Sequence, residues 1–255
     1  MQRELAYSFE GSNNFRDLGG YEVKGKKHIK RGLIIRGARL YDLTEGDRIK
    51  FNSMGIKTVF DLRSKTEADA FPNYKVPGAE NIRMSAMNGP EGEEIDFTPG
   101  NLERNFGEIN EKVFTRIYIQ TAFSNKAYRL LFEYLLEGKS PLFFHCSSGK
   151  DRTGIAAMII LLALGASSED ALYDYTLTNK YNEPQIKALL KERGIDPNDS
   201  KEVAKIMPLY GVLPFMAEET IDAIFKRYST IEEYMKSEYD FDEKKLEKLR
   251  NMYTE

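Results

Sequence analysis

Apolar and polar residues follow one another along the first third of the chain in the rhythm of alternating strands and helices. The runs GLIIRG (32–37) and IKTVFDLRS (56–64) are apolar and rich in β-branched residues, which predicts two strands. Between them, TEGDRIKFNSMG (44–55) predicts a helix that follows Thr44 as its N-cap and stops at Gly55. This alternation indicates an α/β fold.

The pattern weakens over residues 68–110. Four prolines and several glycines interrupt it, and only AENIRMSA (79–86) has the character of a strand. We therefore expect loops or a lid in this segment rather than a linker between domains.

A strand and a buried helix are predicted in the middle of the chain. Apolar residues recur at helical spacing within 127–135 and Gly138 ends that helix, so PLFFHC (141–146) is expected to be a strand. The segment from Thr153 to Leu164 is apolar nearly all round, which is typical of a helix packed against a sheet.

The last third of the chain has helical periodicity only. SSED (167–170) opens one helix, and apolar residues mark two more within 221–228 and 246–253. No flexible boundary separates these helices from the α/β part. We expect one domain over residues 1–255, with a central, mostly parallel sheet flanked by helices and a helical layer over residues 166–255.

The turn between the predicted strand and the buried helix, HCSSGKDRTG (145–154), holds the only cysteine of the chain. Two serines, two glycines and three charges surround this cysteine, whereas a core cysteine has apolar neighbours. A strand, a short polar turn and a helix place several backbone N–H groups at a helix N-terminus, which is an anion-binding arrangement. The expected phosphate-binding residues are Ser147, Ser148, Gly149, Lys150, Asp151 and Arg152.

Cys146 and Arg152 have the spacing of a nucleophile and a phosphate clamp. Six positions separate them, so the loop can curl with Cys146 at its base and the Arg152 guanidinium at one side, while Gly149 tolerates the unusual dihedral angles. Helix N-termini and cations lower a thiol pKa from about 8.5 to roughly 3.5–7.5, which would make this thiol largely a thiolate. The loop therefore predicts phosphocysteine chemistry, with Thr153 hydrogen-bonded to the sulfur and His145 fixing the loop backbone.

Two other interpretations of the loop are weaker. A cysteine that only packs in the core would not need polar neighbours. A Walker-A phosphate loop needs Ser or Thr after its Gly-Lys pair and a glycine at its start. In this chain Asp151 follows Lys150, and Phe144 occupies the first-glycine position.

Composition and charge narrow the classes of partner. The formal net charge is -3, without an arginine-rich tract or zinc-finger spacing, so nucleic acid is not an expected partner. One cysteine and two distant histidines, His28 and His145, predict neither a disulfide nor a metal site, and no cofactor is expected. No apolar run is long enough to span a bilayer, so a cytoplasmic location is the expectation, with export after removal of a leader left open.

The loop sequence HCSSGKDRTG resembles the active-site loop of the cysteine-dependent protein tyrosine phosphatases, in particular the atypical bacterial tyrosine and lipid phosphatases with an HCxxGKDRTG loop. The resemblance extends over nearly the full length. It includes NNFRDLGG (13–20), RGARLYDLT (36–44), VFDLRS (59–64), ALYDYTLTN (171–179), YSTIEEYMKS (228–237) and LEKLR (246–250). It implies the phosphatase α/β sandwich, with Cys146 as nucleophile, Arg152 as transition-state clamp and no metal.

This chain differs from the better-known relatives in the source of its general acid. Those relatives supply an aspartate from a tryptophan-containing mobile loop. This chain has no tryptophan, and no aspartate lies between Asp96 and Asp151. Asp151 is the leading candidate, and the resembling group is thought to use this loop position. The alternative is that Asp151 only ties the loop to an arginine. The acid would then be Asp61 or a glutamate between Glu103 and Glu111.

Charged residues outside the loop have two interpretations each. Asp61 and Arg63 follow a predicted strand at the edge where α/β sheets bind ligands, so they either orient the loop or form an ion pair that holds the turn. For Arg16 and Asp17 the structural role is favoured, because the following Gly-Gly suggests a tight turn.

Three further cations also have two interpretations each. Arg36 and Arg39 either line the pocket mouth or lie on a solvated face. Lys150 either binds the additional phosphates of a phosphoinositide, as the resemblance implies, or neutralises the charge of Asp151.

The predicted function is a phosphomonoesterase that hydrolyses phosphotyrosine through a phosphocysteine intermediate, with phosphoserine and phosphothreonine as further substrates under dual specificity. The alternative enzyme is a phosphoinositide or inositol-phosphate phosphatase. A phosphate-binding module without turnover is disfavoured because nucleophile, clamp and candidate acid are all present. Sulfur transfer or arsenate reduction would require further cysteines.

Overall fold

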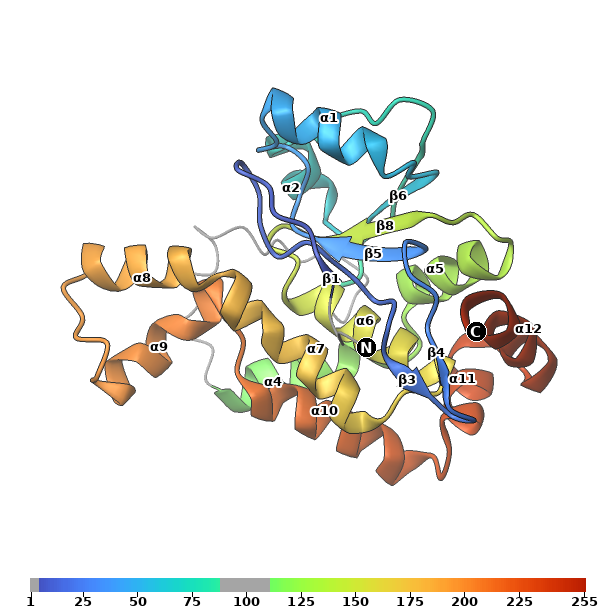
Figure 1. The fold of residues 1–255 in the computed structure, drawn as a ribbon. Helices are drawn as coiled ribbons and strands as arrows, with labels where there is room; N and C mark the ends of the chain where they lie inside the picture. Colours follow the sequence, from blue (N-terminus) through green and yellow to red (C-terminus); the bar gives the residue numbers. More distant parts are fainter. Residues whose placement is uncertain (1–4, 88–110) are drawn as a thin grey trace.

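A six-stranded sheet organises the molecule. The computed structural model describes residues 5–87 and 111–255. The strand order in the larger sheet is β1-β2-β5-β8-β6-β7, and β3 and β4 form a separate two-stranded sheet (Figure 1). The strands are β1 (Leu5–Ala6), β2 (Arg16–Asp17), β3 (Glu22–Val23), β4 (Lys27–His28), β5 (Ile34–Gly37), β6 (Thr58–Asp61), β7 (Glu80–Arg83) and β8 (Leu142–His145).

The four strands from β5 to β7 are parallel, and β1 and β2 extend the sheet in the antiparallel direction. Register places Gly37 and Asp61 on either side of His145, at the carboxyl ends of β5, β6 and β8. Because parallel strands end at the same edge of the sheet, the segments that follow them meet there. The predicted mostly parallel sheet is confirmed.

Helices cover both faces of this sheet. They are α1 (Glu45–Ser53), α2 (Lys65–Ala70), α4 (Glu111–Thr121), α5 (Lys126–Leu136), α6 (Asp151–Leu164), α7 (Ser168–Tyr181), α8 (Glu183–Glu192), α9 (Ser200–Tyr210), α10 (Pro214–Arg227), α11 (Ile231–Tyr239) and α12 (Glu243–Tyr253). Figure 1 shows α1 and α2 above the sheet and α5, α6, α7 and α10 below it.

Alternation of side chains along the strands divides the core in two. On β8, Phe143 belongs to the smaller core under α1, whereas its neighbours Leu142 and Phe144 belong to the larger core on the other face. Ile35 of β5 and Val59 of β6 join the smaller core. Successive strand residues point to opposite faces, so a sheet covered on both sides needs apolar residues throughout.

The central helix α6 is buried along its whole length, as its apolar sequence predicts. It packs against α7 and against the sheet, and Gly165 ends it in the left-handed conformation with a φ of 99°. This burial fixes the N-terminus of α6, and the loop before it, at the carboxyl edge of the sheet.

Local signals at α1 and α2 explain one success and one error of the sequence analysis. Thr44 caps α1 in a capping box with Asp47, as predicted for the start of that helix. The expected strand over 56–64 is shorter, because Ser64 caps α2 in a second capping box, with Glu67. This helix is not among the elements expected from the sequence. The strand expected over 79–86 is β7, and residues 88–110 of the expected loop or lid segment lie outside the described residues.

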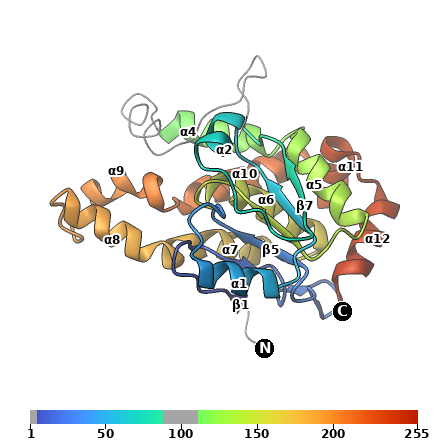
Figure 2. The ribbon, with the colours of Figure 1, turned by 90° about the horizontal axis from the view of Figure 1, so that it is seen from above.

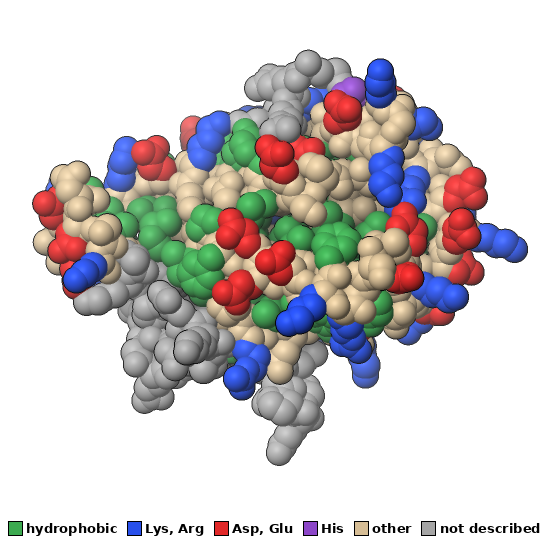
Figure 3. Space-filling model, turned by 90° about the horizontal axis from the view of Figure 1, so that it is seen from below, with side chains coloured by type: hydrophobic (Ala, Val, Ile, Leu, Met, Phe, Trp, Pro, Cys, Tyr) green, Lys and Arg blue, Asp and Glu red, His purple; other side chains and the backbone are tan. Residues whose placement is uncertain are grey.

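The helical C-terminal layer is confirmed from α7 to α12. Seen from above, α8 and α9 extend away from the sheet on one side, and α11 and α12 lie on the other (Figure 2). Seen from below, acidic and basic side chains are interspersed over the helical face (Figure 3). No helix among the described residues combines the length and the apolar character that crossing a membrane requires.

Candidate active site

The loop between β8 and α6 forms a compact turn at the carboxyl edge of the sheet. His145 ends the strand, Cys146 is buried and α6 begins at Asp151. Gly149 has a φ of 64°, and a Cβ at this position would lie 2.3 Å from the carbonyl oxygen of Gly37. Only glycine satisfies both the left-handed conformation and this close approach.

The carbonyl oxygens of residues 146–149 all accept hydrogen bonds, one from His145 at the start of the loop and the others from residues distant in sequence. We call the four residues that supply them the outer donors. The bonds are His145 Nδ1 to Cys146 O at 2.8 Å, Arg39 N to Ser147 O at 3.1 Å, Asn14 Nδ2 to Ser148 O at 3.1 Å and to Gly149 O at 2.9 Å, and Arg36 Nη2 to Gly149 O at 2.7 Å. In a trans peptide the C=O and the following N–H point in opposite directions. Carbonyls held outward therefore turn the amides of residues 147–150 toward the inside of the loop, where an anion is bound.

A buried ion cluster supports two of the outer donors. Asp174 of α7 accepts hydrogen bonds from Arg16 Nε at 2.8 Å and from Arg36 Nη1 at 2.5 Å. Arg16 in turn donates to the backbone oxygen and the side-chain oxygen of Asn14. Burial and the charge of Arg16 lower the pKa of Arg36 to about 10, so it stays protonated at neutral pH. Two arginines against one aspartate leave net positive charge behind the loop.

His145 is held as a neutral ring with one defined tautomer. Its Nδ1 donates to Cys146 O, and its Nε2 accepts from Asn73 Nδ2 at 2.8 Å. Burial lowers the pKa of His145 to about 4, although the nearby Asp61 carboxylate acts in the opposite direction. Asn73 also donates to Asp61 Oδ2 at 3.1 Å, which ties the ring to the end of β6.

Arg152 is oriented by a carboxylate of α2. Glu67 receives two hydrogen bonds from the guanidinium, 2.6 Å from Nη1 and 2.7 Å from Nη2, and a third from Ser147 Oγ at 2.7 Å. Burial raises the pKa of Glu67, but the charge and hydrogen bonds of Arg152 outweigh it and lower this pKa to about 2. We call Arg152 and Glu67 the clamp pair. Its bidentate geometry fixes the plane of the guanidinium at the edge of the loop.

Asp151 lies between a cation and a phenol. Its Oδ2 is 2.7 Å from Lys150 Nζ, and its Oδ1 accepts a hydrogen bond from Tyr118 of α4. Lys150 is therefore placed as expected if it balances Asp151. Thr153 is buried, and its hydroxyl has no hydrogen-bond partner within residues 5–87 and 111–255.

The remaining predicted residues lie behind the loop or beside it. Asp61 and Arg63 form an ion pair at 2.7 Å, and Asp17 accepts from the backbone of Gly19 and Gly32 in a tight turn. The expectation that Arg36 lines a pocket mouth or a solvated face is wrong, because this side chain is completely buried behind the loop.

Arg39 lines a cavity next to the loop. The glutamates proposed as alternative acids, from Glu103 to Glu111, fall outside the side chains that the structure describes.

Sequence reasoning missed five residues that contact the loop or its supports. They are Asn14, Glu67, Asn73, Tyr118 and Asp174. The capping box from Ser64 to Glu67 is a local signal that predicts α2, although it does not indicate that the same carboxylate binds Arg152. No group of three or more His, Cys, Asp or Glu side chains suited to a metal ion occurs in the described part of the chain.

A buried cysteine beneath inward amides, an arginine six positions later and a strand–loop–helix at the edge of a parallel sheet together define the class of cysteine-dependent phosphatases. The family model described as "Tyrosine phosphatase family" matches residues 7–255. The chain therefore belongs to the tyrosine phosphatase family, and its resemblance to that group is confirmed.

Two relatives by sequence agree with this assignment. A Cupriavidus necator protein, H16_A0669, named provisionally as a tyrosine-protein phosphatase, is 24% identical over 96% of this chain and 87% of its own length. The triple specificity protein phosphatase PtpB of Mycobacterium tuberculosis is 26% identical over 71% of this chain and 72% of its own. A solved structure of the core catalytic domain of the PP-IP phosphatase SIW14 from S. cerevisiae, in complex with citrate, matches with 15% identity and a TM-score of 0.36 over 74% of this chain and 98% of that one.

Proposed function

We propose that this member of the family hydrolyses phosphotyrosine in proteins through a phosphocysteine intermediate at Cys146. The observation that carries the proposal is the loop itself: Cys146 lies beneath four outward-held carbonyls and beside an arginine whose guanidinium Glu67 holds in place. A phosphate in this loop receives backbone N–H groups and the Arg152 guanidinium from different sides.

In the first step, the Cys146 sulfur attacks phosphorus and an S–P bond forms as the P–O bond to the tyrosyl oxygen breaks. Asp151 donates its proton to that oxygen, so the leaving group departs as a neutral phenol. Arg152 and the loop amides neutralise the charge of the equatorial oxygens. Asp151 contacts Lys150 and Tyr118 in the structure, and these two contacts must lengthen or break before its carboxyl group can donate the proton.

In the second step, water attacks phosphorus and the S–P bond breaks, which releases phosphate and the thiolate. The Asp151 carboxylate takes the proton of the attacking water and is thereby restored as an acid. The buried Thr153 hydroxyl has no hydrogen-bond partner among the described residues, so it can turn to donate to the sulfur and improve the thiolate as a leaving group.

The proposal treats residues 1–255 as one phosphatase domain that acts on phosphorylated proteins in the cytoplasm. A reducing compartment keeps a lone catalytic thiol reduced, which supports this location. Phosphoserine and phosphothreonine are proposed as further substrates. A phosphoinositide or inositol phosphate is the second candidate, supported by Lys150 in the loop and opposed by its ion pair with Asp151.

The test is phosphate release from a phosphotyrosine peptide, a phosphoserine peptide and phosphoinositide vesicles, with and without a chelator. Cys146→Ser is the control for each substrate, because it keeps the amides and Arg152. We expect turnover of the phosphotyrosine peptide that a chelator leaves unchanged and that Cys146→Ser abolishes. Turnover restricted to phosphoinositides, or activity in Cys146→Ser above a few per cent of wild type, would contradict the proposal.

A further inference from the structure

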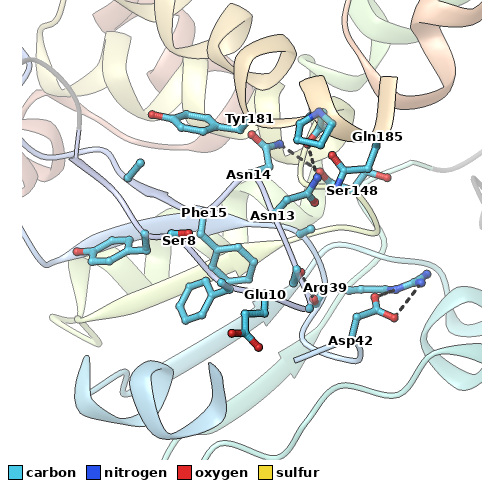
Figure 4. A pocket seen from close by; sticks show the side chains of 18 of the residues that line it. Ser8, Glu10, Asn13, Asn14, Phe15, Arg39, Asp42, Ser148, Tyr181 and Gln185 are labelled. Carbon is cyan, nitrogen blue, oxygen red and sulfur yellow. Dashed lines mark hydrogen bonds and ion pairs between the residues drawn. The ribbon is translucent and has the colours of Figure 1, made fainter. Parts of the chain in front are cut away.

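A cavity of about 760 Å³ opens beside the loop, against Ser147 and Ser148. One wall is the N-terminal segment from Ala6 to Phe15, and the other is the junction of α7 and α8 with the end of α9. In Figure 4, Tyr181 and Gln185 lie on one side of this cavity, and Glu10, Arg39 and Asp42 lie on the other. Ser147 and Ser148 belong both to the loop and to the cavity lining, so the cavity directly adjoins the loop.

The two walls are joined by hydrogen bonds within the protein. Asn13 Nδ2 donates to Asn182 Oδ1 at 2.8 Å, and Asn182 Nδ2 donates to the backbone oxygen of Tyr210 at 2.6 Å. Ser12 Oγ donates to the backbone oxygen of Arg39 at 3.0 Å, which ties the N-terminal wall to the segment after β5. These bonds hold the two walls of the cavity in place, as is usual for sites that bind organic groups.

Its lining suits a polypeptide. Tyrosine and phenylalanine rings offer apolar contact area, and Asn, Gln and Ser side chains offer both donors and acceptors for peptide groups. The aromatic members are Tyr7, Phe9, Phe15, Tyr181 and Tyr210, and the amide and hydroxyl members are Ser8, Ser12, Asn13, Asn14, Ser147, Ser148, Asn182 and Gln185.

The charges of the lining favour a basic ligand. They are two carboxylates, Glu10 and Asp42, and one cation, Arg39. Arg39 Nε is 2.7 Å from Asp42 Oδ2, and its guanidinium lies 3.8 Å from the centre of the Phe71 ring. This arginine is already paired and stacked, so the Glu10 carboxylate sets the charge that a bound group meets.

We propose that this cavity is a substrate subsite that takes the polypeptide next to the phosphotyrosine and prefers a basic side chain there. The proposal rests on the proposed function, since it concerns the segment that flanks the phosphate in the loop. The ring phosphates of a phosphoinositide would lie near two carboxylates, and the one cation of the lining is already paired with Asp42. The lining therefore disfavours a phosphoinositide.

The test uses two phosphotyrosine peptides that differ only in flanking residues, one with lysines on both sides and one with glutamates. The readout is the ratio of their kcat/KM values, because a loss that both peptides share cancels in the ratio. We expect wild type to favour the lysine peptide by about twofold to fivefold, the range of one exposed charge pair. Glu10→Gln should bring the ratio toward one, and Glu10→Lys should invert it.

Glu22→Lys is the matched control, because it makes the same charge change at an exposed position of β3, outside the cavity lining. It should keep the wild-type ratio. Equal rates on the two peptides in wild type, or the same shift in Glu10→Lys and Glu22→Lys, would overturn the subsite while the phosphatase proposal stands. Turnover of a small aryl phosphate without hydrolysis of either peptide would overturn both.

Discussion

Two sets of contacts hold the same loop, and they act on different parts of it. The outer donors bind its carbonyl oxygens from behind, through Asn14, Arg36, Arg39 and His145. The clamp pair binds one side chain, because Glu67 holds the guanidinium of Arg152 by two hydrogen bonds. The first set determines where the backbone amides point, and the second determines where one charged group lies.

This difference predicts different kinetic signatures. Inward amides contact the phosphate oxygens of substrate, inhibitor and transition state alike, so their loss weakens binding of all three. A planar guanidinium matches the equatorial oxygens best when the phosphoryl group is flattened, so its misplacement lowers kcat more than it raises KM. Substitutions in the two sets should therefore separate KM from kcat.

The largest expected effect comes from Asp151. This residue belongs to neither the outer donors nor the clamp pair, so its loss gives a reference for the effects of both. Asp151→Asn should lower kcat/KM, which reports the first step and not the breakdown of the phosphocysteine, by roughly 10² to 10⁴-fold on a phosphotyrosine peptide, the usual size of general acid catalysis. An activated aryl phosphate with a phenol of low pKa needs little protonation and should lose much less. Steady-state kinetics on both substrates measure the difference. An equal loss on the two would make Asp151 a structural loop residue.

The clamp pair is tested next by Glu67→Gln, which keeps the size of the side chain but removes its charge. We expect kcat to fall by about 10²-fold with little change in KM, since small displacements of a catalytic group have effects of this size. Stability should fall by up to about 3–5 kcal/mol, because the buried guanidinium loses its counter-charge.

Glu133→Gln is the matched control, because Glu133 pairs with Arg129 at 3.5 Å on the exposed face of α5. It should leave kcat unchanged. A Glu67→Gln enzyme with raised KM and normal kcat would show that the clamp pair acts on ground-state binding. It would contradict the claim that the clamp pair and the outer donors have different kinetic signatures.

The outer donor His145 predicts a loss of stability in acid. The folded protein keeps this ring neutral because burial lowers its pKa from 6.5 to about 4, whereas the unfolded chain takes up a proton below pH 6.5. The native state therefore loses about 3 kcal/mol relative to the unfolded state as the pH falls from 6.5 to about 4.

Urea unfolding at steps across this range measures the loss, with His145→Asn as the variant that lacks the titrating ring. The pH dependence of that variant should be weaker by the same amount. Parallel curves for wild type and His145→Asn would contradict the neutral, buried ring.

The smallest expected effect is that of Asn14→Gly. Asn14 has a φ of 61°, so glycine removes the donor without backbone strain. We expect KM for an aryl phosphate and the inhibition constant of orthovanadate to rise together, by about tenfold, because two loop carbonyls each lose a hydrogen bond, that of Gly149 a buried one.

Lys26→Gly is the matched control for this change, since Lys26 has a φ of 60° in the turn between β3 and β4. A fall in kcat of Asn14→Gly without a change in vanadate inhibition would assign Asn14 to the clamp rather than to the amides.

The same contrast explains how far the sequence predicts this site. The loop from His145 to Thr153 is contiguous, so its strand, turn and buried helix can be recognised from local pattern. The position of Glu67 in a helix can also be predicted, because a capping box marks the start of that helix.

Three of the four outer donors, Asn14, Arg36 and Arg39, lie far from the loop along the chain. Asn14 bonds to Gly149 across 135 positions, and Arg16 bonds to Asp174 across 158. No local pattern connects such pairs. Asp174 is one of several polar residues of α7, so the sequence of this helix indicates neither that its carboxylate is buried nor which arginines it binds.

The central claim is that Cys146 carries the phosphoryl group, and trapping that species tests it most directly. Asp151→Asn is mixed with an activated aryl phosphate, whose leaving group needs no acid, and the reaction is stopped by rapid denaturation. The loss of the base that activates water should slow the second step, so intact-mass measurement should show a gain of one phosphoryl group, located on the peptide with Cys146. The Cys146→Ser, Asp151→Asn double variant should show none. Turnover of the aryl phosphate without any phosphorylated protein, or a phosphoryl group on another residue, would contradict the account.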